Sequence, residues 1–254
     1  MKDHFTARHP RNEYLEYSRP QPATSYIWNP TDSLNLPKLL IRPEPYYAQP
    51  PRRRRRYEKA KRGIDISVAV AMLVIALPIM AAIIVAIKTT SRGPVFFRHR
   101  RLRKGGVEFD CIKFRTMVED AEELLKNDKS LQERFAARYK IHDDPRITIV
   151  GRILRRTSLD ELPQLIHVIR GEMTLIGPRP IVRDEVPRYS IYSDKLLSVK
   201  PGLSGLWQTS GRSHVSYRQR VHLDMHYIDH RGLLFDLQLL LMTVAAVVRK
   251  TGAC

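Results

Sequence analysis

Two adjacent carboxylates, Asp160 and Glu161, lie beside the paired arginines Arg155 and Arg156 in the middle of the chain. A carboxylate can attack an electrophile or hold a hard cation, and guanidinium groups bind phosphate through paired hydrogen bonds. These residue types, so close together in sequence, therefore suit chemistry on a phosphorylated substrate.

The same stretch also fits a structural role. Ser158 and Glu161 have the spacing of a capping box, in which a hydroxyl and a carboxylate accept hydrogen bonds from free N–H groups at a helix start. Pro163 weakens this interpretation, because with Ser158 as N-cap the proline falls inside the helix. A helix that starts near Asp160 leaves both acids at its mouth, where the helix dipole favours negative charge.

The chain as a whole is strongly basic. Its 254 residues carry a formal net charge of +18, which predicts an anionic partner such as nucleic acid, anionic lipid or a phosphorylated substrate. Cys111 and Cys254 have no feature that pairs them, so we expect free thiols and a reducing compartment. The N-terminus carries no apolar segment, which argues against a cleavable secretory signal.

Residues 1–57 are expected to form a disordered tail, because they are rich in proline and arginine and show no hydrophobic period. An uncharged run from Val68 to Ile87 follows and is long enough to span a bilayer. However, Pro78 removes a helix hydrogen bond in its middle, and the positive-inside rule keeps both basic flanks in the cytoplasm. We therefore predict a re-entrant hairpin over residues 58–90 that breaks at Pro78. A straight span and a buried core helix are the alternatives.

Residues 91–254 mix short strands with helices. We expect strands at Pro94–His99 and Val107–Phe114, a turn at Lys104–Gly106, a polar helix from Val118 to about Tyr139, a short helix or turn at Ile149–Leu154, helices at Leu162–Arg170, Glu185–Ser198 and Ser216–Ile228, a glycine-rich loop at Pro201–Gln208, and an interfacial or packing helix at Leu233–Val248. The predicted fold class is α+β and mostly helical, with a membrane helix hairpin, a β-hairpin and amphipathic interfacial helices.

Six motifs of this chain occur in an order that resembles a known family. They are Lys61-Arg62-Gly63-Ile64-Asp65, Gly93-Pro94-Val95-Phe96-Phe97, Lys113-Phe114-Arg115-Thr116-Met117, Ser158-Leu159-Asp160-Glu161-Leu162-Pro163-Gln164, Leu175-Ile176-Gly177-Pro178-Arg179-Pro180 and Pro201-Gly202-Leu203-Ser204-Gly205-Leu206-Trp207-Gln208. Together they resemble the bacterial sugar transferases, the monotopic polyprenyl-phosphate phosphoglycosyl transferases. The Arg170–Met173 stretch is most similar to the short exopolysaccharide members. One departure is Leu77-Pro78, where the family commonly has Ser-Pro.

The resemblance implies a reaction and its residues. The family moves a sugar-1-phosphate from a UDP-sugar to undecaprenyl phosphate and releases UMP; galactose or glucose is the hexose we expect here. By the match, Asp160 is the nucleophile that forms an aspartyl-phosphosugar intermediate, and Glu161 holds Mg²⁺. Asp224 matches a recurrent family acid, with a structural ion pair as its alternative role. The residues that match the family's phosphate-binding cations are Lys113, Arg155, Arg179 and Arg212.

Several side chains have a structural interpretation beside the functional one. Any of these arginines could be a solvated surface group, and we regard Arg115 and Arg156 as electrostatic support. His167 stands among apolar residues, which favours a core position over a ligand. Trp207 could stack on a base or anchor its loop.

The resemblance also implies a location and partners. We expect a monotopic protein at the cytoplasmic face of the bacterial inner membrane that contacts lipids, acts early in surface-glycan synthesis, and has downstream glycosyltransferases or a second copy of itself as candidate partners. Nucleic acid is not an expected partner, since no helix-turn-helix, zinc or RNP-type motif is present. The competing hypotheses are a membrane-tethered nucleic-acid-binding protein and an inactive lipid-binding scaffold.

Overall fold

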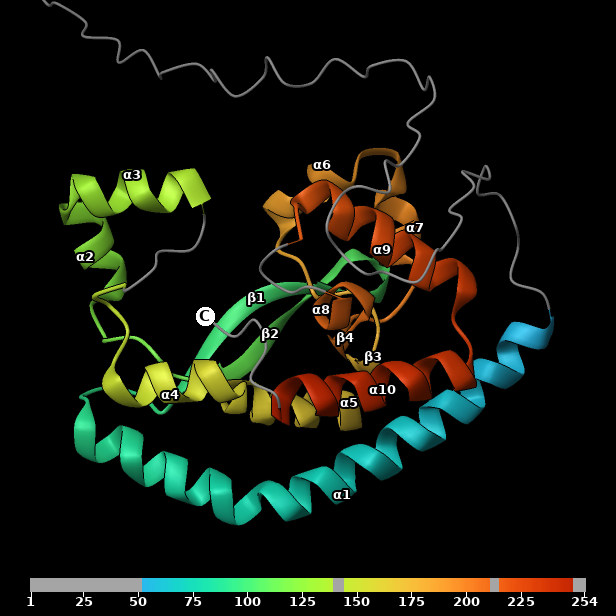
Figure 1. Cartoon of the computed structure of the whole chain (residues 1–254), viewed down its shortest axis with the longest axis horizontal. Helices are drawn as coiled ribbons and strands as arrows, with labels where there is room; N and C mark the ends of the chain where they lie inside the picture. Colours follow the sequence, from blue (N-terminus) through green and yellow to red (C-terminus); the bar gives the residue numbers. More distant parts are fainter. Residues whose placement is uncertain (1–51, 139–143, 211–214, 249–254) are drawn as a thin grey trace, which may run out of the picture. The chain divides into compact units, whose positions relative to one another are not determined.

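A computed structural model describes residues 52–138, 144–210 and 215–248 of the chain, and Figure 1 shows its elements. Most of the fold is helical, with two small sheets, so the α+β class is confirmed in this coarse form. The elements that position the site are α1 (Arg52–Thr90), β1 (Phe96–Arg103), β2 (Val107–Phe114), α4 (Ile149–Thr157), the 3₁₀ helix η3 (Leu159–Gln164), α5 (Leu165–Arg170), β3 (Thr174–Ile176), β4 (Gly202–Ser204), α8 (Leu206–Ser210), α9 (Tyr217–His230) and α10 (Leu233–Val248).

The predicted β-hairpin is confirmed. Strands β1 and β2 pair antiparallel from Phe96 opposite Phe114 to Arg103 opposite Val107, so β1 runs four residues beyond the predicted strand end at His99. A 3₁₀ turn, η2 (Lys104–Gly106), joins them, and both of its glycines have positive φ. Glycine adopts this conformation without steric cost, which explains the tight connection.

A second, parallel sheet forms where the sequence predicted a loop. Strand β4 pairs with β3, with Thr174 opposite Gly202 and Ile176 opposite Ser204. A Cβ on Gly202 would lie 2.1 Å from the backbone nitrogen of Gly177, so only glycine permits this approach. The predicted glycine-rich loop is therefore wrong: the glycines allow strand contact, and α8 follows at once.

Helix α1 is continuous from Arg52 to Thr90 and contains Pro78 in its interior. Figure 1 shows it bending near its middle rather than folding back on itself. The structure thus does not confirm the predicted break at Pro78 or the hairpin. The helix also begins at Arg52, six residues before Glu58, and the hydroxyl of Tyr57 within it donates a hydrogen bond to Asp236 Oδ2 (2.7 Å). The end of the predicted tail is therefore helical.

One side of α1 packs on the protein and the other side is exposed. Ala76, Met80, Ile83 and Ile87 form a buried cluster with Phe114 of β2 and Leu154 of α4. The exposed apolar residues of α1 are Ile64, Val70, Met72, Val74, Ile75, Leu77, Ile79 and Val85. Only 22% of the apolar stretch of α1 is buried, which excludes the alternative of a buried core helix. By its length and composition, α1 could cross a membrane.

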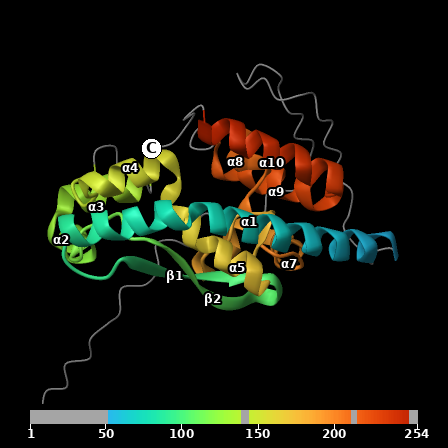
Figure 2. The ribbon, with the colours of Figure 1, turned by 90° about the horizontal axis from the view of Figure 1, so that it is seen from below.

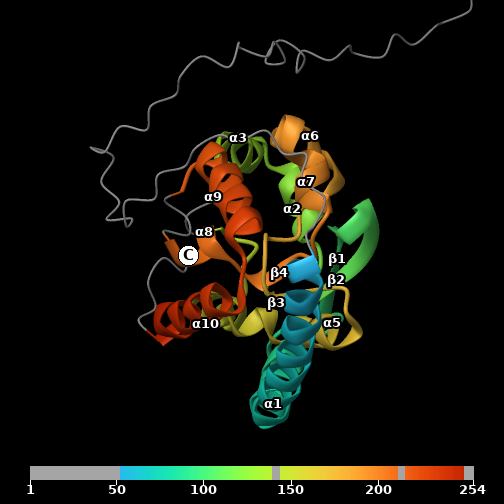
Figure 3. The same cartoon turned by 90° about the vertical axis from the view of Figure 1, so that its right-hand side faces the viewer.

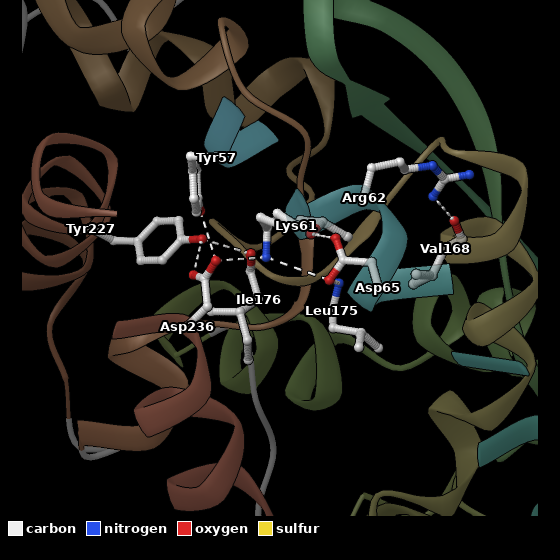
Figure 4. Close-up of polar contacts among 10 residues, drawn as sticks. Tyr57, Lys61, Arg62, Asp65, Val168, Leu175, Ile176, Tyr227 and Asp236 are labelled. Atoms are coloured by element: carbon white, nitrogen blue, oxygen red, sulfur yellow. Dashed lines mark hydrogen bonds and ion pairs between the residues drawn. The ribbon is translucent and has the colours of Figure 1, made fainter. Parts of the chain in front are cut away.

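Polar side chains fix the N-terminal part of α1 to α10 and β3, and α9 joins the same network through Asp236 (Figure 4). Lys61 Nζ lies 3.0 Å from Asp236 Oδ2 of α10, and the Tyr227 hydroxyl of α9 donates to Asp236 Oδ1 at 2.7 Å. Asp65 accepts hydrogen bonds from the Thr174 hydroxyl and, at 3.4 Å, from the Leu175 N–H of β3. Because these groups are almost fully buried, each is paired, which fixes where α1 leaves the domain.

The view from below shows α1 with α4 and α10 on one side and the β-hairpin on the other (Figure 2). In the side view, β3 and β4 lie between α10 and the hairpin (Figure 3), and both strands contact α10. Helix α10 packs through Leu239 and exposes Leu234, Leu237 and Leu241. It is therefore a packing helix whose other face is apolar and open.

Two predicted helices are interrupted. The single helix expected from Val118 to about Tyr139 is divided into α2 (Ala121–Asn127) and α3 (Lys129–Arg138). The break occurs at Asp128, because its backbone is extended and its carboxylate accepts a hydrogen bond from the Leu131 N–H. Residues 139–143, where the predicted helix was to end, lie outside the described part. The helix expected at Glu185–Ser198 is a series of short turns, because Ser190 has positive φ. These are η4 (Arg183–Glu185), α6 (Val186–Tyr189), η5 (Ser190–Tyr192) and α7 (Ser193–Leu197).

Candidate active site

The two adjacent acids lie in η3, between α4 and α5. Ser158 ends α4 in the left-handed conformation (φ 58°), its N–H bonds back to carbonyls of Leu154 and Arg155, and its side chain caps nothing. The capping-box interpretation is therefore wrong. The acids also do not lie at the mouth of α5, which begins at Leu165, because Pro163 is accommodated in the 3₁₀ turn before it.

Two leucines attach η3 to α1. Leu159 and Leu162 pack against the apolar cluster that α1 forms with β2 and α4. Residues three apart share one face of a 3₁₀ helix, so both leucines point to α1. Asp160 and Glu161 stand between them and thus face away from that contact. The leucines therefore hold η3 beside α1, while the two acids point away from it.

The environment of Asp160 combines burial with opposing charges. Its side chain is nearly buried, and burial followed by the charge of Glu161 raises the pKa of Asp160 to about 6. Lys113 and Arg155 act in the opposite direction and favour the carboxylate. The acid therefore stays close to ionised at neutral pH, with a higher basicity than an exposed aspartate.

Lys113 is positioned by a histidine beneath its strand. His167 of α5 is buried, its Nε2 accepts the N–H of Ile112 at 3.0 Å, and its Nδ1 lies 2.6 Å from Glu172 Oε2. The prediction of a core histidine is confirmed, since both ring nitrogens have protein partners. Burial lowers the pKa of Lys113, while the negative charge of Asp160 raises it. The two groups are therefore electrostatic neighbours.

Arg155 is fixed by the Thr116 side chain, which accepts its Nε at 2.8 Å. Helix α4 approaches Thr116 closely at Gly151, where a Cβ would lie 2.0 Å from the Thr116 carbonyl oxygen. Arg155 is thus not a solvated surface arginine. Arg115, expected to give electrostatic support, instead donates to the carbonyl and hydroxyl of Ser91 at 3.1 and 2.7 Å and ties β2 to the end of α1.

Arg179 faces Glu161 from the turn after β3. Its Nη1 lies 3.8 Å from Glu161 Oε1, and both side chains are partly exposed. The turn is held by the parallel sheet, because Gly202 N–H donates to the Pro178 carbonyl at 2.7 Å and Gly177 N–H to the Ser204 carbonyl at 2.9 Å. A shallow hollow opens beside this pair. Its lining residues are His99, Arg101, Cys111, Lys113, Glu161, Gln164, Arg179, Pro180, Gly202, Leu203 and Gln208.

The structure therefore brings together Asp160, Glu161, Lys113, Arg155 and Arg179. Arg212 lies outside the described residues. Two further residues that line the hollow, His99 and Arg101, were assigned no role from the sequence. Both lie on one face of β1, where residues two apart point to the same side. Extending the predicted strand beyond His99 would have placed them together.

Trp207 and Cys111, both noted in the sequence, are buried in the protein. Trp207 is buried with the Arg220 guanidinium 4.4 Å from its ring centre, so it anchors its segment. Burial raises the pKa of the Cys111 thiol to about 11, and the thiol is free. A real capping box does occur at the start of α9, where Ser216 and Gln219 cap each other.

Asp224 is fully buried on α9 and accepts a hydrogen bond from the Tyr189 hydroxyl at 2.8 Å. Among the described residues Asp224 forms no ion pair, and it does not line the hollow beside Glu161, so its role as an accessory acid stays a prediction. Burial raises the pKa of Asp224 to about 7, so the protein holds it partly protonated near neutral pH.

We expect Asp224→Asn to change how stability depends on pH. The folded protein binds the proton of Asp224 more tightly than the unfolded chain, so this residue's contribution is full below pH 4 and is lost as pH rises to about 7. Asparagine does not titrate, so the variant should gain stability relative to wild type over this range, on the order of 4 kcal/mol at most. Thermal unfolding of both proteins at pH 5 and pH 8 in detergent measures it. An unchanged difference between the two pH values contradicts the assignment.

Comparison with known proteins decides the family. The family model described as bacterial sugar transferase matches residues 56–250. The chain belongs to the bacterial sugar transferase family. The resemblance found in the sequence is thereby confirmed, and the chain is a transferase.

Three bacterial proteins are similar to this chain over about three quarters of its length. The exopolysaccharide production protein ExoY of Sinorhizobium fredii is 41% identical over 198 residues, which cover 76% of this chain and 88% of ExoY. The undecaprenyl-phosphate galactose phosphotransferase of Salmonella typhimurium is 44% identical over 197 residues, 76% of this chain and 41% of that protein. The UDP-glucose:undecaprenyl-phosphate glucose-1-phosphate transferase of Escherichia coli is 37% identical over 192 residues, 72% and 39% of the two chains. The match therefore covers most of the length of ExoY but less than half of the length of each of the other two proteins.

Proposed function

We propose that this sugar transferase moves a hexose-1-phosphate from a UDP-sugar to undecaprenyl phosphate, releases UMP, and acts in exopolysaccharide synthesis. The observation that carries the proposal is the buried Asp160, set between Lys113 and Arg155 and next to Glu161. Support also comes from relatives whose names state galactose or glucose phosphate transfer to this lipid. Galactose and glucose are therefore the first sugars to test.

The proposed reaction has two displacements at one phosphorus. The Asp160 carboxylate attacks the phosphorus that carries the sugar, a new P–O bond forms, and the bond to the UMP oxygen breaks. An oxygen of undecaprenyl phosphate then attacks the same phosphorus, and Asp160 leaves as a carboxylate. Lys113 and Arg155 offset the negative charge that approaches the anionic phosphorus, so each displacement has a lower barrier than direct transfer.

Glu161 and the substrate phosphates suit Mg²⁺. The described residues contain no group of three or more His, Cys, Asp or Glu side chains that could hold a metal alone. Mg²⁺ commonly binds one or two carboxylates and completes its shell with water and substrate phosphate, so two adjacent acids beside an open hollow fit it. When bound, it supplies charge neutralisation at the phosphates. Glu161, only loosely paired with Arg179, is the residue that we expect to hold it.

The exposed apolar surfaces support a membrane-bound site. Apolar side chains are exposed on three helices. They belong to α1, to Ile149 and Ile153 of α4, and to Leu234, Leu237 and Leu241 of α10. In the view from below, α4 and α10 both lie on the same side of α1, toward opposite ends of it (Figure 2). A lipid phosphate at the bilayer surface then meets η3, whose leucines rest on α1. We place this surface at the cytoplasmic face of the inner membrane, where UDP-sugars are made.

Release of UMP tests the function. Purified protein in detergent, with undecaprenyl phosphate and Mg²⁺, should release UMP from one UDP-hexose of a panel and form the corresponding lipid-linked sugar diphosphate. Omission of the lipid phosphate should limit release to about one UMP per protein, because the intermediate accumulates. Release of UDP in place of UMP, or release from no sugar of the panel, contradicts the proposal.

A further inference from the structure

The hollow beside Glu161 carries more positive charge than the proposed nucleophile needs. Lys113 and Arg155 are the cations beside Asp160, yet Arg101 and Arg179 also line the hollow, together with His99. Glu161 is the one acid among the residues that line the hollow. The cationic side chains of this hollow repel one another when no ligand is bound, and a bound anion offsets that repulsion.

Arg101 is held in place by two hydrogen bonds. Its Nη1 donates to the Pro180 carbonyl at 3.0 Å, and its Nη2 lies 3.1 Å from His99 Nδ1. The Leu102 N–H also donates to the Ile181 carbonyl at 2.8 Å, which fixes β1 against the turn that carries Arg179. The two guanidinium groups are therefore neighbours on a rigid frame, and they suit planar, bidentate binding of phosphate.

His99 is a neutral hydrogen-bond donor at the same place. Burial, followed by the charges of Arg101, Lys113 and Arg179, lowers the pKa of His99 to about 4. Because Nδ1 accepts from Arg101, the ring proton resides on Nε2 and is free to donate. Imidazole and guanidinium thus form one unit in which Arg101 fixes the tautomer of His99.

We propose that Arg101 and His99 bind the phosphate of the leaving uridine monophosphate. This rests on the function proposed above. In-line displacement puts the nucleophile and the leaving oxygen on opposite sides of the phosphorus. Asp160 is buried and does not line the hollow, but its charged neighbours Lys113 and Glu161 do. Arg101 and Arg179 line the same hollow, so we assign it to the departing nucleotide.

Equilibrium binding of UMP in detergent, without any UDP-sugar, tests this site. Arg101→Gln should weaken UMP binding about 10- to 100-fold, the range for loss of hydrogen bonds to a charged group, and His99→Phe should weaken it about tenfold. Arg101→Lys keeps the charge but lacks the fork, so it should recover only part of the loss. The matched control is Arg98→Gln, which removes the same charge from the same strand but lies exposed on its other face.

The result separates specific binding from general attraction. Loss confined to the Arg101 and His99 variants, with unchanged thermal unfolding, supports the site. Equal effects of Arg98→Gln and Arg101→Gln, or wild-type affinity in Arg101→Gln, overturn it. UMP release from UDP-sugars with wild-type UMP affinity in Arg101→Gln overturns the site and leaves the function standing. Arg101-dependent UMP binding without UMP release overturns the function and leaves the site standing.

Discussion

Replacing Asp160 with asparagine is expected to abolish the covalent phosphosugar intermediate and to lower UMP release by at least about 1,000-fold. Asparagine has nearly the same shape but lacks the basic oxygen that forms the new P–O bond. The side chain is nearly buried, and its neighbours Lys113 and Arg155 keep their places on β2 and α4. The loss should therefore be one of chemistry rather than of folding.

Two measurements check this result. Intact-protein mass after incubation with a UDP-sugar, without lipid acceptor, should show the added hexose-phosphate in wild type and not in Asp160→Asn. The control is Asp110→Asn, which changes an exposed acid of β2 in the same way. Wild-type turnover in Asp160→Asn would falsify the assignment of the nucleophile, whatever the family suggests.

Glu161→Gln is expected to weaken the dependence on Mg²⁺ rather than remove the nucleophile. We expect the Mg²⁺ concentration for half-maximal UMP release to rise at least about tenfold, with turnover at low Mg²⁺ reduced about 100-fold. The charge of Glu161 contributes to the raised pKa of Asp160, so removing it leaves Asp160 more readily ionised. A lower rate in this variant therefore cannot come from a protonated nucleophile.

The measurement is a Mg²⁺ titration of UMP release for wild type, Glu161→Gln and Glu122→Gln. Glu122 is an exposed acid of α2 and serves as the matched control. An unshifted titration in Glu161→Gln, with only the maximal rate reduced, rules out Glu161 as the metal-holding residue. In that case Glu161 would affect the reaction only through its ion pair with Arg179.

Local sequence signals predicted the parts of the fold that local physics decides. The glycine pair at 105 and 106 specified the β-hairpin, because few other residues adopt positive φ. The apolar neighbours of His167 placed it in the core, and the order of six short motifs identified the family. These features depend on near neighbours in the chain, so a sequence alone carries them.

Other errors arose where contacts distant in sequence override local preference. Ser158-x-x-Glu161 has the spacing of a helix start, yet Ser158 ends α4, because the helix continues to Thr157 and its last carbonyls need partners. The segment from Gly202 to Ser204 has the glycine content of a loop, yet it pairs with β3, some 28 residues earlier in the chain. Pairing with β3 makes this segment a strand, and the sequence of residues 202–204 alone does not predict that pairing.

The sequence by itself determined the family and predicted the two acids and most of the cations around them. Tertiary structure decided which face of α1 is covered, because a helix apolar all round has no pattern that marks one side. It also decided that Arg155 binds Thr116, that Asp224 pairs with Tyr189, and that Arg101 and His99 stand beside Arg179. Each of these arrangements depends on packing between elements far apart in the chain, since burial forces polar groups to find partners wherever the fold supplies them.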